Sequence, residues 1–123
     1  MSAASDPVLR VWRGAAKPAD VPAYLAHFRG HVEHTLRALA GYRGAEVLTR
    51  PAGDVVEIVV QTRWASLDAV TAFAGPDPNV AVVEPDALAV LAEHDAFVRH
   101  YAVAHVSAGR EDARGGSTRS TRT

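Results

Sequence analysis

The segment VVEIVVQTRW, residues 55–64, has apolar side chains at both odd and even positions. Successive side chains of a β-strand point to opposite faces of the sheet, so Val59 lies on one face and Ile58 and Val60 lie on the other. The helices of a small α+β domain cover one face of its sheet, and a second apolar face then needs a partner. This strand therefore predicts a homodimer in which two sheets pack face to face.

The order of the predicted elements indicates the fold class. Segments with strand-like or helix-like patterning alternate along the chain. In order they are a strand at residues 8–14, a helix at 21–40, strands at 43–50 and 55–64 joined by a turn at 51–54, helices at 66–74 and 85–95, and a strand at 96–106. This order is typical of the α+β, ferredoxin-like split βαβ sandwich, with one sheet and its helices on one face.

The ends of the helices carry local signals. Asp20 is predicted to cap the first helix, with Pro22 in its first turn, and Gly41 to end it. Ser66 is predicted to cap the second helix and Gly75 to end it. The first helix carries one continuous apolar stripe, formed by Val21, Leu25, Phe28, Val32, Leu36 and Leu39.

Composition narrows the class of protein. The chain has 123 residues and is expected to form one domain at residues 8–106, flanked by disordered segments at 1–7 and 107–123. Its formal net charge of −1 creates no field that would attract nucleic acid or a membrane surface. There is no cysteine, which excludes disulfides and thiolate sites. The first residues lack the pattern of a secretion signal, so we expect a cytoplasmic protein.

Three histidines, His27, His31 and His34, share one face of the first predicted helix. The centre of this face lies more than ~100° from the centre of the apolar stripe, so the imidazoles are expected to face solvent or the helix flank. Histidines four residues apart can bind zinc or nickel, with His34 as the candidate third ligand, but a solvated polar face is the simpler interpretation and we assign no metal. Tyr24 and His31 lie closest to the stripe and are predicted to reach a pocket.

Aromatic and imidazole side chains end several strands. Trp12 and Trp64 either pack in the core or form an aromatic wall that orients a flat ligand. His100 and Tyr101 are adjacent in the last strand and point to opposite faces. An imidazole titrates near neutrality, so His100 either accepts a proton from a phenol or an activated C–H, or is a buried, hydrogen-bonded structural residue.

Two charged residues lie on strands that otherwise look buried, Arg10 on the first and Glu57 on the third. They either pair with each other across the sheet or leave Arg10 to bind an anionic oxygen of a ligand. The sequence is compatible with both arrangements.

Four fragments in this order resemble the antibiotic biosynthesis monooxygenase-like family: GYRGAEVLTR, RWASLDAVTAFAG, AVVEP and HYAV. The resemblance covers roughly residues 8–105. It implies a dimeric α+β barrel with a pocket between the sheet and the helices of each subunit. The family includes cofactor-independent oxygenases of polycyclic aromatic intermediates and haem-degrading enzymes.

The family's site residues match this chain only in part. Oxygenase members similar to this chain have a tryptophan where Trp64 stands, but an asparagine and a tyrosine where this chain has Val60 and Val70. Haem-degrading members have a tryptophan where Phe73 stands and a haem-ligating histidine near Val83. Haem degradation of that type is therefore disfavoured.

These observations predict a cofactor-independent monooxygenase acting on a small aromatic or polyketide-like molecule. The alternative is a non-catalytic dimeric protein that binds a small ligand or haem. In the first case His100 would remove a proton, Arg10 would stabilise negative charge and Trp64 would hold the rings. The predicted substrate contacts are Trp12, Tyr24, His31 and Phe73.

Overall fold

The computed structural model describes residues 6–110, so most of the segments expected to be disordered, 1–7 and 107–123, lie outside the described residues. Its sheet contains β1 (Val8–Ala16), β2 (Tyr42–Ala52), β3 (Val55–Trp64), β4 (Glu93–His94) and β5 (Arg99–Ala102). All pairings are antiparallel, in the order β2-β3-β1-β4, and β5 also pairs with β1. The predicted ferredoxin-like α+β fold is confirmed.

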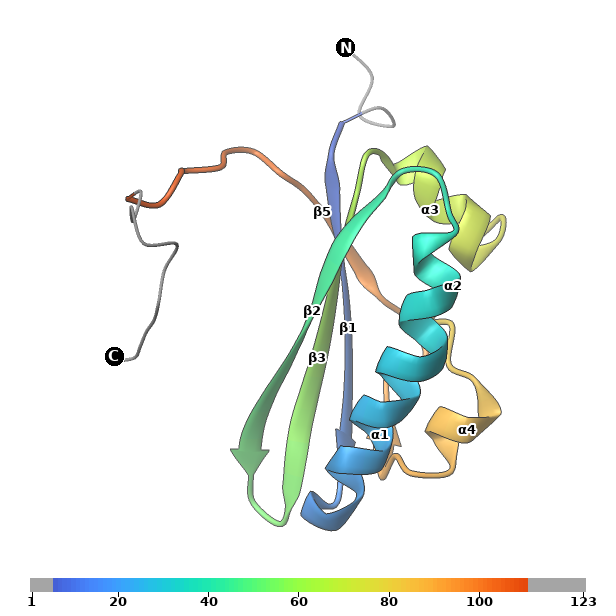
Figure 1. The fold of residues 1–123 in the computed structure, drawn as a ribbon, viewed down its shortest axis with the longest axis vertical. Coiled ribbons are helices and arrows are strands. Elements are labelled where there is room, and N and C mark those ends of the chain that lie inside the picture. The colour runs from blue at the N-terminus through green and yellow to red at the C-terminus, as the bar shows by residue number, and fades with distance from the viewer. Residues whose placement is uncertain (1–5, 111–123) are drawn as a thin grey trace.

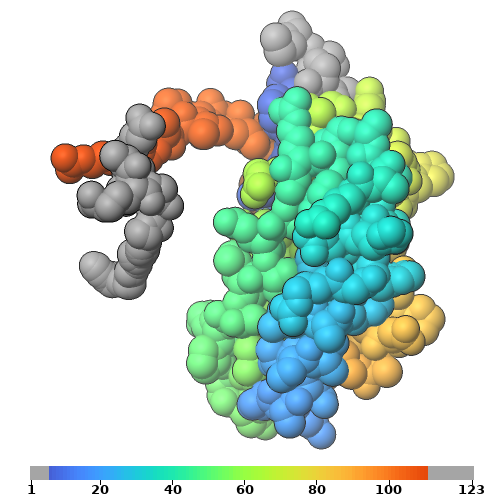
Figure 2. All heavy atoms as spheres, in the orientation of Figure 1, coloured from blue at the N-terminus to red at the C-terminus, as the bar shows by residue number. Residues whose placement is uncertain are grey.

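The last strand differs from its prediction at residues 96–106. Two short strands share the free edge of β1: β4 pairs with Gly14 and Ala15, and β5 pairs with Val8–Val11. Between them the chain leaves β1 because its backbone pairs with another segment. The Val98 N–H donates to the Asn79 carbonyl over 2.9 Å, and Ala81 N–H donates to Ala96. After β5, residues 103–110 form no strand and project away from the body of the molecule (Figure 2).

All helices lie on one side of the sheet (Figure 1). In chain order they are the 3-10 turn η2 (Pro18–Asp20), α1 (Val21–His27), the π-helical turn η3 (Phe28–Val32), α2 (Glu33–Arg37), α3 (Leu67–Ala74) and α4 (Pro85–Leu88). Two expectations are wrong in detail. Asp20 already has helical backbone angles and its side chain makes no capping hydrogen bond. The helix expected at 85–95 is only four residues long.

The first helix is interrupted by its π turn for a geometric reason. Residues spaced by four drift about 40° around an α-helix at each step, so a run of such steps leaves the core-facing side. A π turn accommodates an extra residue and corrects this drift. Tyr24, Phe28 and Leu36, each four or eight residues from the next, are consequently all buried against the sheet.

Two other local signals behave as predicted, whereas one turn differs. The Ser66 hydroxyl accepts a hydrogen bond from the Ala69 N–H over 3.1 Å and caps α3. Gly41 ends the first helix with a φ of +88°, a conformation that favours glycine. The turn between β2 and β3 is tighter than expected, because β2 continues through Ala52.

The two faces of the sheet are covered unequally. On the helix side, the side chains of β3 and the helices form a buried core whose largest fully enclosed members are Trp64, Leu36, Ile58 and Val70. The opposite face carries partly exposed apolar groups, including Leu48 at 45% exposure. No helix within residues 6–110 is long and apolar enough to cross a membrane.

Candidate functional site

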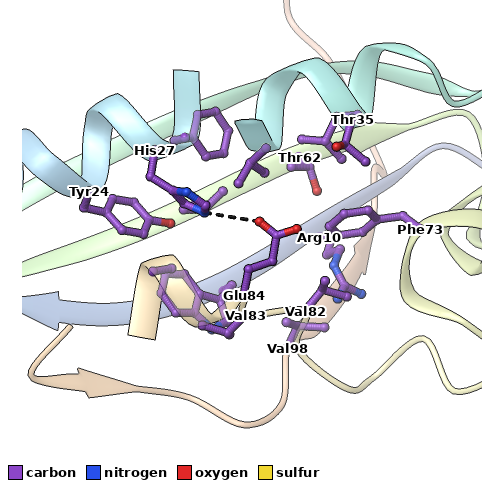
Figure 3. Close-up of a pocket in the computed structure, with 16 residues that line it drawn as sticks. Arg10, Tyr24, His27, Thr35, Thr62, Phe73, Val82, Val83, Glu84 and Val98 are labelled. Atoms are coloured by element: carbon purple, nitrogen blue, oxygen red, sulfur yellow. Dashed lines mark ion pairs between the residues drawn. The ribbon is translucent and has the colours of Figure 1, made fainter. Parts of the chain in front are cut away.

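A cavity of about 70 Å³ lies between the sheet and the helices. Its floor comes from alternate residues of β1 and β3, and its roof comes from α1, η3 and α2 (Figure 3). The segment before α4 forms one side. The lining residues are Arg10, Trp12, Tyr24, His27, Phe28, Val32, Thr35, Leu36, Val60, Thr62, Phe73, Val82, Val83, Glu84, Ala87 and Val98.

Arg10 supplies positive charge to this cavity. Its residue is only 4% exposed, and burial lowers the pKa of its guanidinium to about 10. The Nη1 group donates to the Pro78 carbonyl, and Nη2 donates to the Val80 carbonyl over 2.9 Å. The guanidinium also lies 5.6 Å from the centre of the Phe73 ring, within cation–π range.

A histidine and a carboxylate form a second polar group in the cavity. The Nε2 atom of His27 lies 3.2 Å from Oε1 of Glu84, and Figure 3 shows the two side chains pointing toward each other from opposite sides. Both atoms are buried without a hydrogen-bond partner among the described residues. The other carboxylate oxygen of Glu84 lies 3.0 Å from His31 Nε2. An imidazole beside a carboxylate is suited to accepting and holding a proton.

Aromatic rings line the cavity beside these polar groups. The Trp12 and Tyr24 rings are stacked with centroids 6.2 Å apart, and the Trp12 Nε1–H donates to the Asp95 carbonyl over 3.0 Å. A Cβ atom on Gly14 would lie 2.5 Å from the Trp12 ring, so this glycine lets the indole lie along the strand. Burial raises the pKa of Tyr24 to about 12, which keeps its hydroxyl protonated at neutral pH.

His100 lies beside the cavity wall and is not one of the lining residues. Its Nε2 atom accepts a hydrogen bond from Arg10 Nη1 over 3.0 Å. Burial, followed by the nearby charge of Arg10, lowers the pKa of His100, which favours the neutral imidazole. The geometry therefore places His100 behind Arg10, with Arg10 between it and the cavity.

Of the predicted aromatic residues Phe73 and Trp64, one lines the cavity and the other lies behind it. Phe73 lines the cavity, whereas Trp64 is 1% exposed and lies in the core behind it. The two rings are stacked with centroids 6.0 Å apart, and Trp64 Nε1–H donates to the Thr62 hydroxyl over 2.8 Å. Trp64 thus supports two lining residues from the core. Val60, which stands where similar oxygenases have asparagine, lines the cavity directly.

The histidine face of the first helix is split by the fold. The His27 side chain is 10% exposed and lines the cavity, so the expectation that it faces solvent or the helix flank is wrong. The prediction that His31 reaches the pocket is also wrong, because its side chain is 60% exposed and is not one of the lining residues. His34 is exposed. Across the part of the chain that the structure describes, no three His, Cys, Asp or Glu residues are arranged to hold a metal ion.

The two charges expected on buried strands do not meet. Glu57 lies on the open face of the sheet and binds Arg13 and Arg50, with Arg50 Nε–Oε1 at 2.9 Å. Arg10 points to the opposite face because it lies an odd number of residues from Arg13. Of the two arrangements that the sequence left open, the cross-sheet pair is therefore excluded.

Sequence reasoning missed His27, Glu84, Thr35 and Thr62 as lining residues. The signal for His27 was present, because it follows Tyr24 by three residues and precedes Phe28. Placing the buried stripe around Tyr24 and Phe28 would have turned His27 inward. Glu84 had no such signal, since its position depends on the path of the segment before α4.

Residues 7–83 match the sequence model of the antibiotic biosynthesis monooxygenases. A solved structure of a proposed antibiotic biosynthesis monooxygenase from Bacillus cereus is similar, with a TM-score of 0.62 and 17% identity over 86% of this chain and 99% of that one. Among curated proteins, none matches this chain.

Two further solved structures have a similar fold. A monooxygenase of the Streptomyces coelicolor gene ActVA-Orf6, in complex with nanaomycin D, gives a TM-score of 0.52 at 17% identity, over 90% of this chain and 96% of that one. The haem-degrading protein Rv3592 of Mycobacterium tuberculosis gives a TM-score of 0.51 at 20% identity, over 85% of this chain and 99% of that one. At these identities the likeness concerns the fold.

Proposed function

Since the chain belongs to the antibiotic biosynthesis monooxygenase family, we propose that it binds a small, electron-rich aromatic molecule in the cavity and oxidises it with O₂. The observation that most supports this function is the composition of the cavity wall. Aromatic rings flank a space that holds a buried cation and a histidine–carboxylate pair (Figure 3). Flat apolar walls orient a ring, and the few polar groups handle charge and protons.

The proposed reaction needs no bound cofactor. A base removes a proton from an activated C–H₂ group of the substrate, and the resulting anion gives one electron to O₂. The substrate radical and superoxide then combine through a new C–O bond. The peroxide loses water as its O–O bond breaks, which leaves a C=O group, so one CH₂ and one O₂ become one C=O and one H₂O. The positive charge of Arg10 favours the anionic states along this path.

We assign the proton acceptor to the pair formed by His27 and Glu84. Both residues line the cavity, and their facing atoms are 3.2 Å apart. His100 was the candidate from the sequence, but its Nε2 lone pair is occupied by Arg10 and the residue lies outside the lining. The pair takes up the proton as a unit, and His31 holds the second oxygen of Glu84.

Oxygen uptake with an anthrone-type substrate tests this assignment. We expect His27→Gln to reduce the rate of uptake about 100-fold, because loss of a general base typically costs at least that factor. His34→Gln, an exposed histidine of the same helix, is the matched control and should leave the rate unchanged. A larger loss in His100→Gln than in His27→Gln would return the role to His100. Absence of uptake by the unmodified protein would refute the proposed reaction.

The volume of the cavity limits the size of a substrate that it can enclose completely. A free volume of about 70 Å³ admits a few water molecules and is smaller than a molecule of several fused rings. A larger substrate would therefore extend through the rim, or displace the segment that carries Val82 and Glu84.

We also propose that two copies of the chain pack through the open face of the sheet. That face carries Val59, Leu48 and Tyr101, with Leu48 and Tyr101 exposed in the single chain. Large apolar side chains that a sheet face exposes to water favour association. The dimer would bury the side of the sheet opposite the cavity, leaving one cavity in each subunit.

A non-catalytic binding protein is the second candidate. Val60 in the cavity wall favours it, because the resembling oxygenases have a polar asparagine there. The lining favours a ligand other than haem, since His27 is the histidine in the cavity wall and its Nε2 atom faces Glu84. Ligand binding without oxygen uptake by the unmodified protein would support the binding function over the enzyme.

A further inference from the structure

Arg10 is a buried cation that has no carboxylate partner in the part of the chain that the structure describes. The ion pairs among residues 6–110 involve other arginines and histidines, and none includes Arg10. Its contacts are two backbone carbonyls, the His100 imidazole and the Phe73 ring. These groups accept hydrogen bonds or present electron density, but none carries a negative charge. A buried charge is normally compensated, so this one is available to a charged ligand.

The neutral state of His100 leaves that charge uncompensated. The His100 Nε2 atom accepts a hydrogen bond from Arg10 Nη1, which requires a free lone pair on Nε2. Burial and the charge of Arg10 both lower the pKa of His100 and keep it neutral. The imidazole therefore fixes the orientation of the guanidinium without contributing a countercharge. This makes His100 a positioning residue for Arg10.

The unused donors of Arg10 indicate what kind of anion it accepts. A guanidinium has five N–H groups. Two on Nη1 and one on Nη2 are engaged by Pro78, His100 and Val80. The Nε–H and the second hydrogen of Nη2 have no acceptor among the described residues. Two N–H groups on one planar fork match the two oxygens of a carboxylate.

The rest of the cavity complements such a ligand. Arg10 lies next to Phe73, and the cavity's own carboxylate, Glu84, pairs with His27 on the other side (Figure 3). A ligand with its negative group at Arg10 therefore leaves its uncharged ring for the Trp12 and Tyr24 side, near Glu84. The opposite orientation would place like charges together.

We propose that the cavity selects planar aromatic carboxylates, anchored by their carboxylate on the Nε and Nη2 groups of Arg10. This inference rests on the proposed function and deepens it by naming the substrate class. An anchored carboxylate positions the ring between the arginine and the His27–Glu84 pair. It also supplies the countercharge that the buried guanidinium lacks.

Binding of a matched pair of compounds tests this selectivity. 2-Naphthoate and 2-naphthamide have nearly the same shape and differ in charge, and their binding can be followed by calorimetry or by quenching of tryptophan fluorescence. We expect the unmodified protein to bind the naphthoate at least tenfold more tightly. Arg10→Gln should abolish the difference, and Arg10→Lys should retain only part of it because lysine has no planar fork. Benzoate and benzamide repeat the comparison with one ring.

Arg13→Gln is the matched control, since Arg13 belongs to the same strand but lies on the open face. It should leave the preference intact. Equal affinity of the unmodified protein for both compounds would overturn the inference, as would loss of the preference in Arg13→Gln. Failure of both compounds to bind would overturn it too. If the preference holds while no anthrone-type substrate is oxidised, the proposed reaction is wrong and the anion site stands.

Discussion

The two faces of the sheet are made by the same strands but are buried to different extents. On the helix side, Ile58 and Trp64 are fully enclosed by residues of the same chain. On the opposite side, Val59 lies between them in sequence yet is only partly covered, and its cross-strand neighbour Leu48 is exposed. A single chain thus covers one face and leaves the other partly exposed, because its helices lie on one side only (Figure 1).

Two arginines of β1 extend the comparison to charges. Arg13, on the open face, binds Glu57, which also binds Arg50. Arg10, on the helix face, has no carboxylate partner within residues 6–110. The same residue type three positions apart is therefore paired with a carboxylate in one case and held by backbone carbonyls and an imidazole in the other.

The largest expected effect concerns the completed face. Trp64→Ala should lower the free energy of unfolding by about 3–5 kcal/mol, because it removes a large, fully enclosed ring from the core. Val59→Ala, on the same strand but on the open face, should cost less than half as much in a monomer. Denaturant unfolding of both variants measures the contrast, and equal losses would show that the two faces are equally packed.

A charge on the open face should act on assembly. If this face forms the dimer, Val59→Asp should weaken association at least tenfold, since the new carboxylate would lose its hydration in the interface. Light scattering at micromolar concentration would then show a dimer for the unmodified protein and a monomer for the variant. Leu88→Asp, at an exposed site on α4, is the control and should stay dimeric. A well-folded monomer of the unmodified protein would contradict the proposed assembly.

The smallest expected effect concerns the ion cluster that Glu57 forms with Arg13 and Arg50 on the open face. Hydrogen bonds from Arg13 and then Arg50 hold the pKa of Glu57 below its usual 4.5. Because the folded pKa lies below the unfolded one, the carboxylate stabilises the fold above pH 4.5, and this contribution is lost as the pH falls through the folded pKa.

Thermal unfolding of Glu57→Gln and the unmodified protein checks this sign. The unmodified protein should be slightly more stable at pH 7, and the difference should shrink toward pH 3. A difference that grows on acidification would mean that Glu57 is not the titrating group.

The fold was predictable from the sequence because its signals are local and periodic. Alternation in β3, the cap at Ser66 and the stop at Gly41 each act within a few residues. The last strand, predicted at residues 96–106, was predicted less well. The pairing of residues 96–98 with residues 79–81 holds part of this segment away from β1. Such a competition between two backbone partners leaves no trace in hydrophobic periodicity.

The site was predictable in part for a similar reason. Arg10, Trp12, Tyr24 and Phe73 line the cavity as expected, because the alternation of a strand and the face of a helix place them there. The histidines were harder to place, since the predicted stripe was drawn through Leu25 and not through the buried Tyr24, which turned His27 outward. Its partner Glu84 depends on the path of the segment before α4, which carries no periodic signal.

The central position of β1 has a consequence for how the molecule assembles. β1 is the first strand along the described chain, yet the strands that complete its second edge come from residues 93–102. The contact between Arg10 and His100 joins residues 90 positions apart. Contacts of such long sequence separation form slowly. We therefore expect the edge between β1 and β5 to close after the local β2–β3 hairpin, so that a weakened final strand would leave Arg10 without its imidazole partner in an otherwise folded chain.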